Sequence, residues 1–500
     1  MQLKRPILVG GLGLSAILWL LNIVGHSPVG YALGDGSALM GMAVLGSGLW
    51  LFKQGKSAEL AIDPPLALQT VDRSAVDKVT SRIEATIATL IEELPEEIKE
   101  DKAQPIWTQI EQKRQAISQV VKNIERESLT VAVVGNKSTG KTALASYLSE
   151  HWQTAHPQVE NITETEGEAS LPSADADIVL FMTAGDLTQS ELQRIHTLLK
   201  AGYRTQIVFN KQDQLAPADR QSVLQRIQTR VEDLGIGVSA IATQPNPIKV
   251  RRHQDNGEIE EFTEQPQPQL SSLTDRLTHL VNSEAQQLVL TTTLRQANAL
   301  RADTQNLLNA QRQQRALPII EQMQWIAAGS AFASPMPSLD LLAATAINAQ
   351  MIVDLGKVYG QTFSLEQAKK AAGTLAELLV RLGLVELSTQ VLGSLLKTYA
   401  ATYLAGGAVQ GVSAAYLTRV VGLSLVEFFE EQSLLPVEKR KFAFDSMFSD
   451  RGFTDMGDRL QTIFKTTNQS LGLQSFVQQT LAHLPVSEKN PVSEKKQVAA

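Results

Sequence analysis

The pattern of apolar and polar positions changes several times along the 500-residue chain, and each change marks a different kind of segment. Residues 6–24 carry no charged side chain and are long enough to cross the hydrocarbon core of a membrane as a helix. A second apolar run, rich in glycine, covers residues 38–52 and is short for a membrane span unless it also includes residues 31–36. Two such runs joined by a short loop predict a transmembrane helical hairpin within residues 1–54.

The positions of lysine and arginine predict how this hairpin is oriented. Lys4 and Arg5 precede the first run, Lys53 and Lys56 follow the second, and the loop at residues 26–37 contains neither residue type. Because basic residues stay on the cytoplasmic side, both ends of the hairpin are expected to face the cytoplasm or stroma. The alternative is a cleaved signal peptide, which the second apolar run and the lack of a small-residue cleavage site disfavour.

Helical periodicity follows in residues 55–127. After a proline-containing linker, apolar residues recur at spacings of three and four, namely Val79, Ile83, Ile87, Leu90 and Ile91. A second stretch with the same spacing covers residues 106–124. Both stretches are expected to be packing helices.

The pattern then switches to that of an α/β domain over residues 128–282. Short apolar runs at residues 129–134, 177–183 and 205–210 are typical of buried strands, and a helical pattern separates the last two. Residues 158–163 are a poor strand candidate. Strands that alternate with helices predict a mostly parallel sheet covered by helices on both faces.

The remainder of the chain is predicted to be helical. A long helix at residues 283–316 has a coiled-coil-like seam, and it could equally be a plain helix packed on its own domain. The seam consists of Leu290, Leu294, Ala297, Leu300, Thr304 and Leu307. Residues 317–432, rich in alanine and glycine, are expected to form a compact helical domain that lies on or partly in the membrane. Residues 433–500 are expected to form a C-terminal helical region and a disordered tail.

Composition excludes several classes of function. The net charge of −7 and the lack of a long basic run argue against nucleic acid as a partner. The chain contains no cysteine, so disulfides, thiolate catalysis and cysteine-ligated zinc are excluded. The seven histidines are scattered and do not suggest a metal cluster.

The candidate chemistry begins directly after the first predicted strand, where the sequence matches the phosphate-loop pattern G-x-x-x-x-G-K-S/T. Its glycines allow backbone N–H groups to point at phosphate oxygens at the start of a helix. Lys141 would neutralise the β and γ phosphates, and the Thr142 hydroxyl would bind Mg²⁺. The predicted phosphate-binding residues are Gly135, Asn136, Lys137, Ser138, Thr139, Gly140, Lys141 and Thr142.

A second motif predicts which base is bound. Asn210, Lys211 and Asp213 form N-K-x-D at the end of a predicted strand. The carboxylate of Asp213 can accept the ring N–H and the amino N–H of guanine, and adenine offers no such donor pair. Ser239 and Ala240 are predicted to form a third base-side element through their backbone. The expected ligands are therefore GTP or GDP with Mg²⁺.

Two resemblances to known families follow from these residues. The phosphate loop, the N-K-x-D motif and Ser239-Ala240, in this order, resemble the G domain of Era-like small GTPases over about 140 residues. Residues 317–432, with "SPMPSLD" and "LAGGAVQGVSAAYLTRVVG", resemble the domain of unknown function of YcjF-like membrane proteins. The second resemblance implies association with a membrane and implies no chemistry.

The sequence departs from the Era-like pattern at the switch regions. The family has a D-x-x-G motif after its second strand, and only "ETEG", residues 164–167, stands in a comparable place. Thr163 and Thr165 are weak candidates for the magnesium-binding threonine of switch I. Asp175 and Asp177 open the next strand, where a structural role is expected. No residue is therefore assigned as catalytic.

Three functions remain open at this point. The first is a membrane-anchored GTPase that acts as a nucleotide switch or in membrane organisation, with homo-oligomer formation possible. The second is a guanine-nucleotide-binding membrane scaffold that does not hydrolyse GTP and recruits partners. The third is a transporter-like role for the alanine-rich helices, weakened by charges that interrupt each candidate span. Membrane lipid is the expected partner in each case, and the sequence does not identify protein partners.

Overall fold

The computed structural model describes residues 70–152, 159–164, 171–253, 259–333, 337–396, 407–435, 450–470 and 473–484. All of them belong to one compact unit, Leu66–Ala500. The predicted transmembrane hairpin within residues 1–54 and the predicted tail after residue 484 lie outside the described residues.

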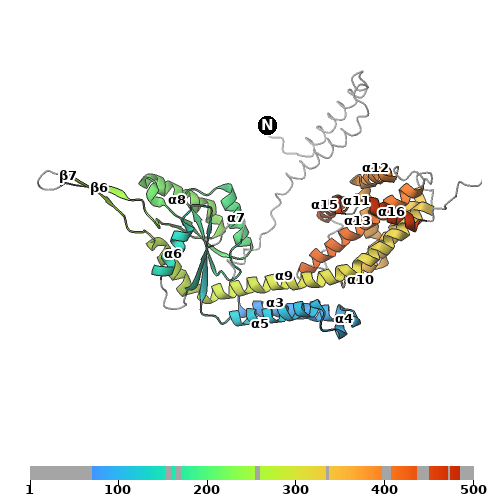
Figure 1. The fold of residues 1–500 in the computed structure, drawn as a ribbon, viewed down its shortest axis with the longest axis horizontal. Helices are drawn as coiled ribbons and strands as arrows, with labels where there is room; N and C mark the ends of the chain where they lie inside the picture. Colours follow the sequence, from blue (N-terminus) through green and yellow to red (C-terminus); the bar gives the residue numbers. More distant parts are fainter. Residues whose placement is uncertain are drawn as a thin grey trace, which may run out of the picture. The chain divides into compact units, whose positions relative to one another are not determined.

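A parallel sheet forms the centre of the α/β region (Figure 1). Its strands are β1 (Leu129–Gly135), β2 (Val159–Glu164), β3 (Ile178–Thr183), β4 (Arg204–Phe209) and β5 (Val238–Ala240), in the order β2-β1-β3-β4-β5. Every neighbouring pair in this sheet is parallel. The predicted parallel sheet is confirmed, and the poor strand candidate at residues 158–163 is its edge strand β2.

Helices cover both faces of this sheet because side chains alternate along each buried strand. Val131 and Val133 face one side, where α6 (Lys141–His151) and the start of α9 (Ser271–Ala333) pack. Ala132 and Val134 face the other side, where α7 (Gln189–Lys200) and α8 (Pro217–Val231) pack. The predicted layering is therefore confirmed.

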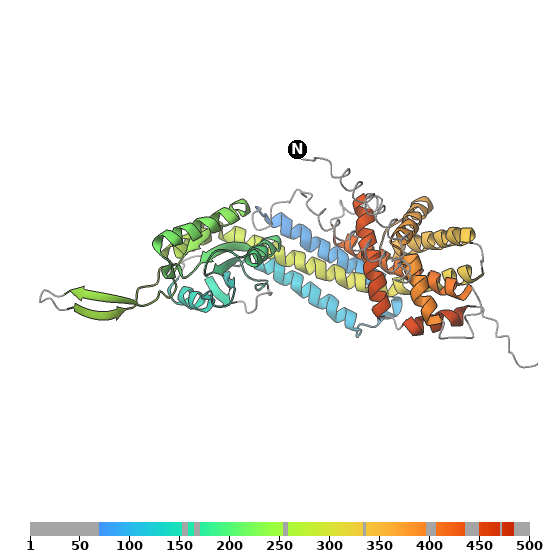
Figure 2. The same ribbon diagram turned by 90° about the horizontal axis from the view of Figure 1, so that it is seen from above.

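The connection between the sheet and α9 contains an element that the sequence analysis did not anticipate. Strands β6 (Ile248–His253) and β7 (Ile259–Glu264) form a separate antiparallel hairpin (Figure 2). Short 3₁₀ helices lie elsewhere in the α/β region, η3 (Gln212–Gln214) after β4 and η4 (Glu232–Leu234) after α8.

The long helix α9 packs against helices of its own chain. Its middle part shares a hydrophobic cluster with α3 (Arg73–Glu93) and α5 (Pro105–Asn123), which are joined by the short α4 (Glu96–Glu100). Most of the predicted seam lies in or against that cluster, namely Leu290, Leu294, Ala297, Leu300 and Leu307. The seam of α9 is therefore covered by helices of the same chain. Both predicted boundaries, after residues 282 and 316, fall inside α9.

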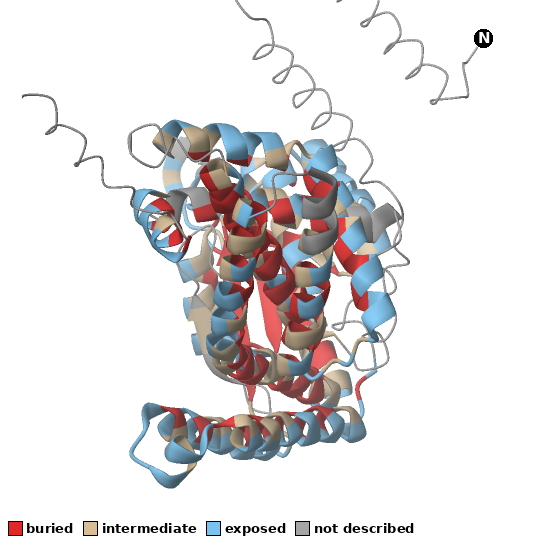
Figure 3. Cartoon of the chain, turned by 90° about the vertical axis from the view of Figure 1, so that its right-hand side faces the viewer, coloured by how far each residue is buried: buried red, intermediate tan, exposed pale blue. Residues whose placement is uncertain are grey.

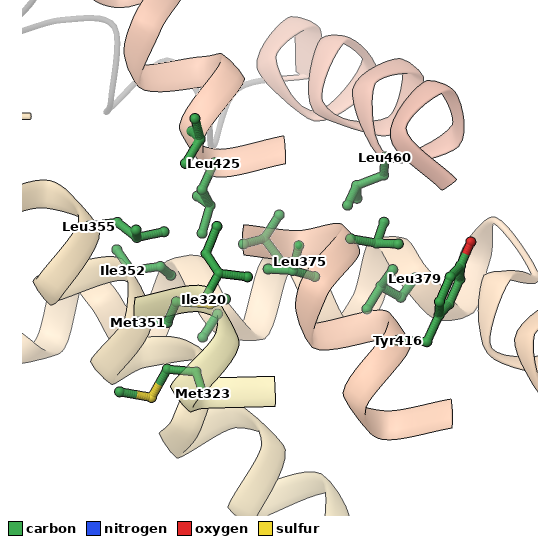
Figure 4. Packing of buried hydrophobic residues seen from close by; sticks show 14 of the residues in the cluster. Ile320, Met323, Met351, Ile352, Leu355, Leu375, Leu379, Tyr416, Leu425 and Leu460 are labelled. Carbon is green, nitrogen blue, oxygen red and sulfur yellow. The ribbon is translucent and has the colours of Figure 1, made fainter. Parts of the chain in front are cut away.

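The rest of the described chain is a helical domain built around the end of α9. Its elements are α10 (Pro337–Val358), α11 (Leu365–Arg381), α12 (Leu384–Leu396), α13 (Gly407–Leu434), α15 (Asp450–Ser470) and α16 (Leu473–His483). Ile320 of α9, Leu375 of α11 and Leu425 of α13 meet in one apolar core (Figure 4). Buried residues gather where the helices face one another, and the exposed residues lie on the outer surfaces (Figure 3). The predicted compact helical domain is confirmed.

The central helix of this domain, α13, is apolar over most of its length. Among the described residues it is the one single helix long and apolar enough to cross a membrane, and 72% of its apolar window is buried against other parts of the chain. Helices α11 and α12 would pass the same test as a pair, although they are bent by 66° at their junction. Burial of this extent is the expected state of the core helix of a helical domain.

A buried polar network joins the helices around α9. The Arg312 guanidinium donates to both carboxylate oxygens of Glu93, at 2.6 and 3.1 Å, and to the carbonyl of Tyr359 at 3.3 Å. The Tyr359 hydroxyl donates to Glu430 Oε1 at 3.0 Å. Burial raises the pKa of Glu430 and of Tyr359. Burial acts in the same direction on Glu93, but Arg312 and Arg315 outweigh it and hold the pKa of that carboxyl below its ordinary value.

Candidate nucleotide-binding site

The predicted phosphate loop connects the carboxyl end of β1 to the first turn of α6. A Cβ atom at Gly135 would lie 2.5 Å from the Met182 carbonyl oxygen of the neighbouring strand β3. Gly140 has a φ of +94°, and a Cβ there would lie 2.3 Å from Nδ2 of Asn210. Gly135 is therefore required by the close approach of β3, and Gly140 by its positive φ and the close approach of the Asn210 side chain.

Hydrogen bonds inside the loop converge on the backbone of Asn136. Its carbonyl oxygen accepts from the Thr139 hydroxyl at 2.9 Å and from Lys141 Nζ at 3.0 Å. Lys137 and Ser138 are exposed at the outer part of the loop, and Ser138 has a φ of +63°. The Lys141 ammonium is therefore hydrogen-bonded to the backbone of the phosphate loop.

Asn210, the first residue of the N-K-x-D motif, joins three segments of the site. Its Nδ2 donates to the Thr139 carbonyl of the phosphate loop at 2.9 Å. Its Oδ1 accepts from the backbone N and the hydroxyl of Thr243, at 3.0 and 3.1 Å. All three side chains are at least 95% buried. The two sequence motifs are therefore in direct contact, and the segment after β5 completes the arrangement.

Asp213 lies next to this junction in the short helix η3. The preceding Lys211 has a φ of +60°, which turns the chain sharply after β4. Asp213 Oδ2 accepts from the backbone N of Asn246 at 3.0 Å, and Asp213 Oδ1 is buried without a hydrogen-bond partner. A buried carboxylate oxygen that lacks a hydrogen-bond donor is suited to a ligand that donates N–H groups.

The third predicted base-side element, Ser239 and Ala240, lies in the last strand of the sheet. Ser239 and Ala240 belong to β5, and both are tied to Ser272 at the start of α9, at 3.4 Å and 2.8 Å. The residues that contact Asn210 and Asp213 are Thr243 and Asn246, farther along the chain. The role predicted for Ser239 and Ala240 stays a prediction, and the structure offers the loop after β5 as a second candidate.

The sequence analysis also missed Glu191, which contacts the phosphate loop from α7. Glu191 is 5% exposed, and its Oε1 accepts from Asn136 Nδ2 at 3.0 Å. The "TQSE" signature of a capping box predicts that Glu191 closes the N-terminus of α7. The same signature gives no indication of a contact with a loop 55 residues earlier in the chain.

The candidate switch region is described only in part. Strand β2 ends at Glu164, whose backbone pairs in register with Val133 of β1, and residues 165–170 lie outside the described residues. Helix α6 ends at His151 and β2 begins at Val159, so the connection between them is short. Thr163 Oγ1 is buried without a hydrogen-bond partner. Thr142 is exposed in the first turn of α6.

Asp175 and Asp177 lie at the opposite edge of the sheet from the phosphate loop. The Asp177 carboxylate is buried, forms an ion pair with Arg126 and accepts from the Thr130 backbone N at 2.8 Å. Asp175 Oδ1 accepts from Gln296 Nε2 at 2.7 Å. These contacts fix the start of β3, in agreement with the structural role expected for this position.

A pocket of about 800 Å³ lies far from these motifs in the chain, between α9, α13 and α15. Its lining is acidic and includes Glu427, Glu430, Glu431, Asp455 and Asp458. Arg459 forms ion pairs with the first and third of these carboxylates. The pocket therefore belongs to the helical domain and not to the nucleotide-binding candidate.

One known family matches the helical part of the chain. A family described as a domain of unknown function, DUF697, matches residues 295–468, from the middle of α9 into α15. The region compared with YcjF-like proteins, residues 317–432, lies inside this match, so that part of the resemblance is confirmed. Comparison with curated proteins gives no significant match. The α/β region is compatible with a GTPase domain through its parallel sheet.

Proposed function

We propose that this chain is a membrane-anchored guanine-nucleotide-binding protein whose α/β region is an Era-like G domain. The observation that carries the proposal is the bridge made by Asn210 between the phosphate loop and Thr243. Two motifs that are separate in the sequence are joined by buried hydrogen bonds at the carboxyl edge of a parallel sheet, where ligands of such sheets bind. A chance match to either motif alone would give no reason for this contact.

The preference for guanine rests on Asp213. One of its carboxylate oxygens is buried and lacks a donor, and the N–H groups on the Watson–Crick edge of guanine would supply one. Adenine has an acceptor nitrogen at the corresponding ring position, and that atom would face the carboxylate unfavourably.

The phosphates are expected to bind to the loop between β1 and α6. Its backbone N–H groups and the N-terminus of α6 attract negative charge, and Lys141 adds a full positive charge. Thr142 stays the predicted ligand of Mg²⁺, which would neutralise the phosphate oxygens when bound.

Calorimetry on the full-length protein in detergent tests this assignment. GDP and GTP are expected to bind with micromolar or tighter dissociation constants, and ATP much more weakly. Lys141→Ala should weaken GDP binding by about 1.5–3 kcal/mol or more, the scale of a charge-assisted hydrogen bond. Asp213→Asn should shift the preference toward xanthine nucleotides, because an amide can donate to the additional oxygen of xanthine. Equal affinities for ATP and GTP would show that the base assignment is wrong.

Hydrolysis of GTP is the second part of the proposal, and one observation favours it. Glu164 ends the strand next to β1, which is where the D-x-x-G motif begins in the Era-like family. The short connection between α6 and β2 instead favours the scaffold alternative, because it leaves little chain for a switch I segment. Release of phosphate from GTP above the level of a Lys141→Ala control would identify an enzyme. Tight binding without such release would identify the scaffold.

The membrane anchor in this proposal rests on the two apolar runs before residue 54. If both are transmembrane helices, the protein should stay in the membrane pellet after alkaline carbonate extraction. A tag placed in the loop at residues 26–37 should resist protease added from the cytoplasmic side, while the G domain is digested. A mature N-terminus near residues 27–37 would show instead that the first run is a signal peptide.

A further inference from the structure

The capping box at the N-terminus of α7 does more than close the helix. The Thr188 hydroxyl accepts from the Glu191 backbone N at 3.3 Å, and Glu191 Oε2 accepts from the Thr188 backbone N at 2.8 Å. The Thr188 hydroxyl also lies 2.8 Å from Glu191 Oε2. These contacts occupy one carboxylate oxygen and leave Oε1 available, which accepts from Asn136 Nδ2 at 3.0 Å. The cap and the phosphate loop are therefore held by the two oxygens of one side chain.

A second capping box in the same chain shows that helix capping does not need this additional contact. At the N-terminus of α11, Ser364 and Gln367 form the same reciprocal pair, at 3.2 and 2.9 Å. Gln367 has a single acceptor oxygen, and the cap uses it. Glu191 has a second acceptor and is 5% exposed, so the contact with Asn136 is partly shielded from water.

Asn136 links Glu191 to the lysine of the phosphate loop through two hydrogen bonds. Its side chain is held by Glu191, and its carbonyl accepts from both Lys141 Nζ and the Thr139 hydroxyl. A shift of Asn136 would therefore move the acceptor that orients the Lys141 ammonium. Displacements well below 1 Å are sufficient to weaken a short charge-assisted hydrogen bond.

We propose that Glu191 is a positioning residue of the nucleotide site, which fixes the phosphate loop through Asn136 and thereby sets the affinity for the phosphate groups. This inference rests on the nucleotide-binding function proposed above.

The test is a set of variants of the full-length protein, with GDP as the probe in calorimetry. Asn136→Asp places a second carboxylate against Glu191, and it should weaken GDP binding on the order of tenfold or more, because adjacent like charges repel. Glu191→Gln in the same protein should restore about tenfold of the loss, because the glutamine oxygen can keep the cap while its amide donates to Asp. Glu191→Gln alone is measured as the reference from which the rescue is calculated, as in a double-mutant cycle.

Ser138→Asp is the matched control, because it adds the same charge to the same loop at a position without the contact to Glu191. In this variant, Glu191→Gln should improve the affinity for GDP by no more than about threefold, which is the small effect of removing one distant charge. Thermal unfolding of each protein without nucleotide separates loss of folding from loss of binding. A helix cap without a role in the loop would change the unfolding temperature and leave the dissociation constants unchanged.

Three results would overturn the inference: Asn136→Asp binds GDP as wild type does, the rescue fails, or the rescue is equally large for Ser138→Asp. Rescue that is specific to Asn136→Asp supports it. A wild-type protein that binds no guanine nucleotide would refute the proposed function itself. Because it is seen with the wild-type protein alone, that outcome can be told apart from a failure of the Glu191 inference.

Discussion

Replacing Asn210 with alanine tests the contact that holds the candidate site together. The change removes the donor to the Thr139 carbonyl and the acceptor for two donors of Thr243. Both partner residues are at most 5% exposed, so water cannot readily replace the lost bonds. An unsatisfied buried polar group costs about 1–3 kcal/mol. With a backbone carbonyl and a backbone N–H both left unpaired, we expect Asn210→Ala to destabilise the α/β region by about 3–5 kcal/mol.

Hydrogen exchange is the appropriate measurement, because a chain with several folding units need not unfold in one step. The free energy of opening should fall for amides of β1 and β4, and it should stay unchanged for amides of α11 in the helical domain. Thr243→Val is the matched control, since it removes one of the three hydrogen bonds and should cost about 1 kcal/mol. Unchanged exchange in β1 and β4 of Asn210→Ala would refute the reasoning that this side chain links the two motifs.

Three further predictions concern packing and charge away from the phosphate loop. Asp177→Ala should destabilise the α/β region by about 3–5 kcal/mol, because it leaves Arg126 without its buried partner; if the side chain is structural, titrations with Mg²⁺ and GDP should match wild type. Because Arg312 helps to hold the pKa of Glu93 below its ordinary value, the stability from that ion pair is present above the unfolded pKa of about 4.3 and is lost as pH falls through the folded value. Unfolding temperatures measured across pH 3–6 (roughly the range around this pKa) should therefore fall less steeply for Glu93→Gln than for wild type, and equal slopes would contradict the assignment. Gly422→Ala should lower the free energy of unfolding by about 1–3 kcal/mol, because its Cβ would lie 2.8 Å from a buried isoleucine side chain of α9. Thermal unfolding measures this change, and an unchanged stability would show that α9 and α13 can move apart without destabilising the domain.

Much of the α/β region could be predicted from local patterns. Short apolar runs between helical segments indicate buried parallel strands, because both faces of such a sheet are covered. The glycine spacing at residues 135–142 placed a loop between β1 and α6, and Gly140 has the positive φ for which glycine is suited. The seam of α9 was visible as a periodicity of three and four residues.

The partners of these segments could not be predicted, because a periodic pattern says that a face is buried and not what buries it. The seam of α9 suited a coiled coil and a packed helix equally, and only the structure showed that α3 and α5 cover it. The predicted boundaries at residues 283 and 316 fall inside α9 for a related reason. Helix ends depend on tertiary contacts, and those contacts continue along α9 on both sides of residues 283–316.

The sequence by itself determined which chemical groups are available for a nucleotide: a lysine after a glycine-rich loop, and an asparagine and an aspartate after a later strand. Only the tertiary structure decided how these groups are held. Asn210 meets Thr139 across 71 residues, and Glu191 meets Asn136 across 55. Parallel strands bring their carboxyl ends to one edge of the sheet, so residues that follow different strands become neighbours there. Their identities are local properties of the sequence, whereas their contacts depend on strand order and on the packing of α7 against the sheet.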